Sequence, residues 1–178
     1  MARVRLLVSD IDGTLVTAQK ALTTRAAAAV ASLARSCMAF TLISSRPPPG
    51  MAGLVRTLKV HLPFTAFNGG NLVAPDMSLI LIHRLSVEVA ARTLTLLSSR
   101  GVDAWLFADG AWFLRDPDGS NVARERLTVG FDPTAVEAGK PTLPALRAGI
   151  CPVGRGCRGV YDRARWTSTS RLLVAPGQ

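Results

Sequence analysis

The chain has 178 residues, of which 48% are hydrophobic and 19% charged, and its formal net charge is +9. This length and composition predict one compact domain, or one domain that carries an insertion, and they exclude a collagen-like or wholly disordered chain. No apolar run approaches the roughly 18 residues that a transmembrane helix needs, and the run at residues 6–8 meets Asp10 too soon for a signal peptide. We therefore expect a soluble, cytoplasmic protein without a membrane partner.

The positive charge is unevenly distributed along the chain. Residues 141–178 contain six arginines, five glycines and one acidic residue, and they show little periodicity before residue 171. We interpret them as an atypical tail, distinct from residues 1–140. A basic segment of this kind is commonly a solvated surface, so nucleic-acid binding is the least favoured of the functions considered.

The first third of the chain alternates short apolar runs with helical patterns, which is typical of a β-α-β core with a parallel sheet. Thr23 or Thr24 can cap a helix that ends near residue 35, and residues 51–60 have helical spacing after three prolines. Strands are expected at residues 4–9, 38–44 and 64–67. This order predicts an α/β core over residues 1–72.

The pattern changes after residue 71, where a hairpin replaces the alternation of strand and helix. The expected elements are a hairpin over residues 71–83, a helix over 86–100, a second hairpin over 104–115 and a short helix over 121–127. Together they predict an α+β unit over residues 73–140.

The most informative cluster is the sequence D-I-D-G-T-L at residues 10–15, which directly follows the first expected strand. Ligands of open α/β sheets bind at this carboxyl edge. A carboxylate there can attack phosphorus if a divalent cation offsets the repulsion between the two anions, and Asp10 suits that role. A second carboxyl group can protonate the leaving oxygen and then accept a proton from water, which suits Asp12. Gly13 permits a tight turn close to a phosphate, and Thr14 adds a hydroxyl donor.

This arrangement resembles the haloacid dehalogenase superfamily of phosphohydrolases, and further motifs resemble its Cof-type sugar-phosphate phosphatases, over about residues 3–136. Such proteins bind phosphate through a small hydroxyl residue after the second strand, usually in a T-G-R context. Here Ser44, Ser45 and Arg46 stand in that place, with Ser45 replacing the glycine. Their third strand ends in an N-G-A-like sequence, which implies that Asn68 lines the phosphate pocket.

The resemblance implies both a fold and an activity. The fold is α/β, with a Rossmann-like core, a parallel sheet that is incomplete at its C-terminal side, and an inserted α+β cap that selects the substrate. The activity is Mg²⁺-dependent hydrolysis of a small phosphomonoester, with a sugar phosphate favoured, through an aspartyl-phosphate at Asp10. Asp10 and Asp12 would hold the metal.

Two features of the family are not found in this sequence. One is a lysine that neutralises the phosphate, and the other is an acidic G-D-x-x-N-D loop that completes the metal site; Lys20, Lys59 and Lys140 lie outside the expected context. Mg²⁺ prefers octahedral oxygen coordination, usually with more than one carboxylate. The alternative is therefore a catalytically impaired remnant of a truncated or frameshifted gene, which folds and binds phosphate or metal weakly.

The incomplete sheet has a consequence for the first strand, which would have no neighbour on one side. Residues 171–175 could pair there, or a second copy of the chain could. The sequence therefore predicts a homodimer through this edge as one way of covering it.

Overall fold

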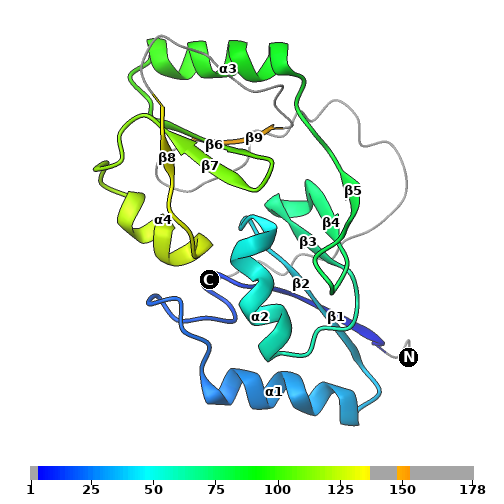
Figure 1. Cartoon of the computed structure of the whole chain (residues 1–178). Coiled ribbons are helices and arrows are strands. Elements are labelled where there is room, and N and C mark those ends of the chain that lie inside the picture. The colour runs from blue at the N-terminus through cyan, green and yellow to red at the C-terminus, as the bar shows by residue number, and fades with distance from the viewer. Residues whose placement is uncertain (1–3, 137–147, 153–178) are drawn as a thin grey trace.

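The computed structural model describes residues 4–136 and, for the backbone alone, residues 148–152. The elements around the first sheet are β1 (Leu6–Asp10), α1 (Thr24–Arg35), β2 (Ala39–Ile43), the 3-10 helix η1 (Pro48–Met51), α2 (Ala52–Thr57), β3 (Phe64–Ala66), the 3-10 turn η2 (Phe67–Gly69), β4 (Asn71–Val73) and β5 (Leu79–Ile82). Those around the second sheet are α3 (Val87–Ser99), β6 (Ala104–Ala108), β7 (Ala111–Leu114), α4 (Val122–Val129), β8 (Thr134–Ala135) and β9 (Ala148–Pro152). Figure 1 shows the two sheets at different levels of the molecule, with α1 and α2 beside the first and α3 along the second.

Three parallel strands form the part of the first sheet that carries the sequence motifs. The sheet has the order β1-β2-β3-β4-β5, and the first three strands run in the same direction. Asp10 lies opposite Ile43, and Ile43 lies opposite Thr65. Because parallel strands end at the same edge, the loops after β1, β2 and β3 meet there. The expected β-α-β core is confirmed.

The hairpin expected over residues 71–83 forms, but its strands extend the first sheet. β4 pairs antiparallel with β3, and β5 pairs antiparallel with β4. The tight turn at η2 folds β4 back beside β3, so that Val73 lies opposite Phe64 in the same core. The first sheet therefore continues to Ile82, and the second begins at β6.

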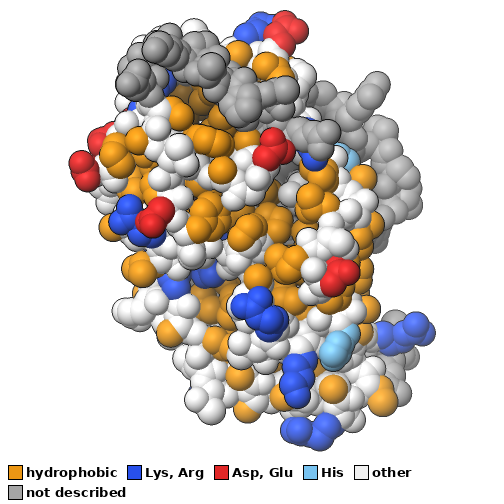
Figure 2. Space-filling view, in the orientation of Figure 1, with side chains coloured by type: hydrophobic (Ala, Val, Ile, Leu, Met, Phe, Trp, Pro, Cys, Tyr) orange, Lys and Arg blue, Asp and Glu red, His pale blue; other side chains and the backbone are white. Residues whose placement is uncertain are grey.

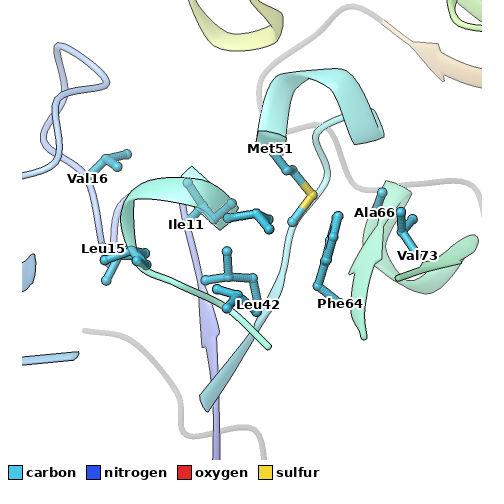
Figure 3. Packing of buried hydrophobic residues seen from close by; sticks show 11 residues of the cluster. Ile11, Leu15, Val16, Leu42, Met51, Phe64, Ala66 and Val73 are labelled. Carbon is cyan, nitrogen blue, oxygen red and sulfur yellow. The ribbon is translucent and has the colours of Figure 1, made fainter. Parts of the chain in front are cut away.

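The core of the first unit lies between the strands and the helical segment that follows β2. Ile11, Met51 and Phe64 are fully buried, and Figure 3 shows Met51 and Phe64 pointing toward one another, with Leu42 beneath them. Ile11 points into this core between two acidic residues, because side chains alternate along an extended chain. Its burial anchors the loop that carries the acids.

The second unit has an aromatic core between β6, β7 and α4. Trp105, Phe107 and Trp112 are buried, and the Phe107 and Trp112 rings stack with centroids 5.9 Å apart. Phe67 packs against the cores of both units, and its ring centroid lies 5.7 Å from that of Phe107. Hydrophobic side chains are visible across the middle of the face in Figure 2, at the level where the units meet. Of the helices that the structure describes, none has the length and apolar character to cross a membrane.

β1 is an edge strand among the described residues. It pairs with β2 on one side, and β1 ends the strand order of the first sheet. Leu6, Leu7 and Val8 keep 48%, 40% and 43% of their surface exposed. The expected edge is thus present in the described part of the chain, while residues 171–175, the expected partner strand, lie outside the described residues.

Candidate functional site

The loop after β1 folds back on itself. The carbonyl oxygen of Ile11 accepts hydrogen bonds from the amides of Leu15 and Val16, at 2.9 and 3.1 Å. Gly13 has a φ of +82°, a left-handed conformation that glycine adopts without steric cost. Val16 then bridges to Leu22, so residues 17–21 form the tip of a short hairpin beside the acidic loop.

Two cations hold the carboxylate of Asp12. Arg46 donates from Nε to Oδ2 at 2.8 Å and from Nη2 to Oδ1 at 2.9 Å, and Lys20 donates from Nζ to Oδ1 at 2.7 Å. The side chains of Arg46, Lys20 and Asp12 are 6%, 15% and 24% exposed. Arg46 and Lys20 are positively charged and Asp12 is negatively charged, so the cluster has a formal charge of +1.

The pKa of Asp12 reflects a balance of opposing effects. Burial acts to raise this pKa, but the hydrogen bonds and charges of Arg46 and Lys20 together outweigh burial and hold it below the ordinary value of 3.8. In this state Asp12 is an anion at neutral pH, and both its oxygens accept hydrogen bonds. Asp12 is therefore held as the carboxylate and takes up a proton less readily while both cations are bound to it.

The loop after β2 is tied to the loop after β3. The Oγ atom of Ser44 accepts a hydrogen bond from the Arg46 amide at 3.2 Å, and the Ser44 carbonyl accepts one from the Asn68 amide at 2.7 Å. The Arg46 carbonyl accepts the amide of Phe67 at 3.1 Å. Phe67 and Asn68 both have positive φ, 50° and 53°, so the connection to β4 is a strained turn. Ser44, Arg46 and Asn68 thus lie together at one edge.

The remaining residues expected at the site lie on the exposed side of the same edge. Asp10 is exposed at the end of β1, and Gly13, Thr14 and Ser45 are exposed in the adjoining loops. Among the described residues, no hydrogen bond or ion pair joins the side chain of Asp10 to Asp12 or to its two cations. Asp10 is therefore not held by the Asp12 cluster.

The sequence analysis did not place Lys20 at the site. Lys20 reaches Asp12 because the hairpin between Val16 and Leu22 folds back, with the Lys20 amide bonded to the Thr17 carbonyl at 2.9 Å. The signal in the sequence was a short polar stretch between two apolar residues directly after the acidic motif. It predicts a turn, but not the contact that the lysine makes.

The second residue that the sequence analysis missed is Glu125, on α4 of the other unit. Burial raises the pKa of Glu125, and the charges of Lys20, Asp12 and Arg46 all act on its carboxyl group. Figure 1 shows α4 over the hairpin that follows β1. A carboxyl group from the second unit thus lies within electrostatic range of the Asp12 cluster.

A family model described as haloacid dehalogenase-like hydrolase matches residues 7–141, which include both sheets up to β8 and the whole Asp12 cluster. The chain belongs to this family. A comparison with curated proteins finds no significant match.

Solved structures of haloacid dehalogenase-like proteins share the fold. One such hydrolase from Bacteroides thetaiotaomicron has a TM-score of 0.70 at 18% identity, over 85% of this chain and 59% of its own. A HAD/COF-like hydrolase from Plasmodium vivax has a TM-score of 0.68 at 12% identity, over 85% and 57%. A subclass IIB sugar phosphatase has a TM-score of 0.67 at 16% identity, over 84% and 58%. The chain thus has the Rossmann-like α/β core of the family and spans less than two thirds of these relatives.

The haloacid dehalogenase-like fold implies a bound Mg²⁺, and the described residues provide part of a site for one. Both carboxylate oxygens of Asp12 are taken by cations, so the side chain of Asp12 is not free to bind a metal. The exposed Asp10 carboxylate and the Asp12 carbonyl remain, and oxygen donors of this kind suit Mg²⁺, which keeps several waters and binds substrate phosphate. No group of three or more acidic, histidine or cysteine side chains lies close enough to hold a metal within the described ranges.

A cavity of about 310 Å³ lies between the two units of this haloacid dehalogenase-like chain. Residues 47–49 line one side, the tip of the β6–β7 hairpin at Asp109 and Gly110 lines another, and Phe67 contributes to the wall. Residues 47–49 directly follow Arg46, and Phe67 directly precedes Asn68. The cavity therefore adjoins the loops after β2 and β3, which belong to the candidate site. Its volume is at the lower end of the range for small-molecule pockets, roughly 300–1,000 Å³.

Proposed function

We propose that this protein is a phosphatase that hydrolyses a small phosphomonoester, with Asp10 as the nucleophile and a sugar phosphate as the favoured substrate. One observation carries the proposal: an exposed acid at the end of β1 is followed two residues later by an acid held by two cations, within the residues that the family model matches. The structural relatives include a protein described as a sugar phosphatase, which supports the substrate class.

The proposed reaction has two steps at phosphorus. An oxygen of Asp10 forms a bond to phosphorus while the bond between phosphorus and the leaving oxygen breaks, which gives an aspartyl-phosphate and an alcohol. Water then attacks phosphorus, releases inorganic phosphate and restores the Asp10 carboxylate. Mg²⁺, held by the Asp10 carboxylate and the Asp12 carbonyl, would offset the repulsion between carboxylate and phosphate.

Asp12 is proposed as the proton carrier for both steps, and its two cations set its pKa. When substrate phosphate attracts Lys20 or Arg46, Asp12 loses stabilising charge and its pKa rises. The carboxyl group can then take up a proton, donate it to the leaving oxygen and later accept one from water. Phosphate binding thereby prepares the acid that the first step needs.

The groups proposed to bind phosphate come from the three loops at the carboxyl edge that also carries Asp10. Gly13 and Thr14 come from the loop after β1, Ser44 and Ser45 from the loop after β2, and Asn68 from the turn after β3. Arg46 connects two of these loops, because its guanidinium binds Asp12 and its backbone amide donates to Ser44. The Ser44 hydroxyl already accepts one hydrogen bond, and its proton remains available for a phosphate oxygen.

The test is a phosphatase assay with Mg²⁺ on the wild type and on Asp10→Asn. We expect release of phosphate by the wild type and its loss in Asp10→Asn, because an amide oxygen is a poor nucleophile. Asp103→Asn, an exposed acid in the loop before β6, is the matched control and should keep full activity. Equal rates for wild type and Asp10→Asn would remove Asp10 from the mechanism.

A second candidate is an impaired relative that binds phosphate or metal without turnover. It is favoured by the partial metal site, because the described residues offer no third acidic ligand near Asp10. Binding of inorganic phosphate and Mg²⁺ by calorimetry, without phosphate release from any ester, would identify this case.

Three further expectations from the sequence stay predictions: a cytoplasmic location, no nucleic-acid partner and a homodimer through β1. The observation that bears on the last is the exposed edge of β1, with Leu6, Leu7 and Val8 each at least 40% exposed.

A further inference from the structure

We propose that Glu125 determines substrate specificity: it binds hydroxyl groups of the alcohol that leaves, and it disfavours alcohols that carry a second anionic group. This inference rests on the proposed phosphatase function and concerns the part of the substrate beyond the reacting phosphate.

Close packing fixes the position of α4, the helix that carries Glu125. α4 packs on η1 so tightly that a Cβ atom on Gly50 would meet the Cα of Val129 at 3.0 Å and the carbonyl oxygen of Thr128 at 3.3 Å. The carbonyl of Gly50 in turn accepts a hydrogen bond from Arg46 Nη1 at 3.2 Å. The helix that carries Glu125 is therefore docked on the same segment that holds the arginine of the Asp12 cluster.

Glu125 is a partly buried acid without a partner. Among the described residues, its carboxyl group forms no hydrogen bond and no ion pair, although Lys20 and Arg46 are near enough to act on its pKa. Both of those cations are instead bound to Asp12. A half-buried carboxyl group that is left unpaired beside a cationic cluster is costly in stability, and such groups concentrate at functional sites.

The chemistry of the ligand follows from the two sides of the site. Lys20 and Arg46 come from the first unit and are the cations that would attract a phosphate, whereas Glu125 comes from the second unit and lies within electrostatic range of both. A carboxylate accepts hydrogen bonds from hydroxyl groups and repels anions. The group on the far side of the phosphate should therefore be a neutral, hydroxyl-bearing one.

The experiment measures binding in the Asp10→Asn chain, so that turnover is not needed. Calorimetry in Mg²⁺ compares three probes: glucose 6-phosphate, fructose 1,6-bisphosphate and acetyl phosphate, which has no hydroxyl group outside its phosphate. Glu125→Gln and Glu125→Ala are added to Asp10→Asn, with Glu88→Gln, an exposed acid of α3, as the control.

We expect Glu125→Gln to bind the bisphosphate about tenfold more tightly, because a charge repulsion is removed, with glucose 6-phosphate changed less than threefold. Glu125→Ala should weaken glucose 6-phosphate about tenfold relative to acetyl phosphate, whose affinity should change by the same small factor in both variants because both remove the same charge. An equal change for all three probes, or no change for any, would overturn the role of Glu125 while leaving the phosphatase proposal intact. If the chain with Glu125 intact binds none of the probes, both proposals fail.

Discussion

Asp12, which is bound by two cations, contributes to the stability of the acidic loop. Because the native pKa of Asp12 lies below its ordinary value, ionised Asp12 stabilises the fold above about pH 4, and this contribution is lost as the pH falls through the native pKa. Lys20→Ala should lower the midpoint of thermal unfolding at pH 7, and the difference from wild type should shrink in acid. Thermal unfolding monitored by circular dichroism from pH 7 down to pH 3 measures both.

Lys59→Ala is the matched control for this prediction. Lys20 and Lys59 both have left-handed backbone conformations, with φ of 64° and 51°, so the two substitutions carry similar backbone effects. Lys59 is exposed and bonds no acid among the described residues. A pH-independent loss that is the same in both variants would attribute the effect to the backbone and not to the ion pair.

The raised pKa of Glu125 predicts that stability depends on pH in the direction opposite to that expected from Asp12. Its native pKa is raised above the ordinary 4.5, so the stabilising state is the protonated one, and that contribution is lost as the pH rises through the native pKa. Glu125→Gln should therefore be more stable than the wild type at pH 8, and the two should converge toward pH 4. A glutamine that is destabilising at pH 8 would show that the carboxylate is a structural group.

At the scale of residues, the sequence identified the side chains that follow strand ends but not those brought in by folding. Asp10, Asp12 and Arg46 can be placed at one edge because the parallel strands before them end there. Lys20 depends on a hairpin that turns back, and Glu125 on the docking of another unit, and neither contact has a local signature.

Among the elements, the contact between η1 and α4 sets how closely the two units approach. Gly50→Ala would place a Cβ atom 3.0 Å from the Cα of Val129, so the helices must separate, at a cost of about 1–3 kcal/mol in the free energy of unfolding. Gly53→Ala, three residues later in α2, meets nothing within 4 Å and should be neutral or stabilising by up to about 1 kcal/mol. Urea unfolding of both variants measures the difference, and an equal effect would show that the packing at η1 yields easily.

The ends of helices could be predicted from the sequence where a capping residue or a proline marked them. Thr23 accepts the Ala26 amide and Ser86 accepts the Val89 amide, so the helices begin where the sequence predicts. The extension of the first sheet by β4 and β5 was not predictable in the same way. It follows from the left-handed turn at Phe67 and Asn68; asparagine adopts such backbone more readily than most residues, but phenylalanine does not.

On the scale of the whole molecule, Phe67 connects the site to both hydrophobic cores. Its ring packs against the cluster of the first sheet and against Phe107 in the second, while its amide is bonded to the Arg46 carbonyl. Through Phe67, the aromatic core that includes Val122 and Val129 of α4 is in packed contact with the loop of Arg46.

The exposed edge of β1 gives the prediction that concerns the molecule as a whole. A strand whose outer edge pairs with none of the described residues, and whose apolar side chains are 40–48% exposed, is a template for pairing with another chain. We expect concentration-dependent self-association in sedimentation velocity, and we expect Leu7→Lys to suppress it, because a charged edge strand resists pairing. Leu62→Lys, in a loop and of similar exposure at 37%, should leave the association unchanged. Circular dichroism should first show that both variants are folded; a wild type that stays monomeric at all concentrations would refute pairing through β1, since the edge would then be stable without a second copy.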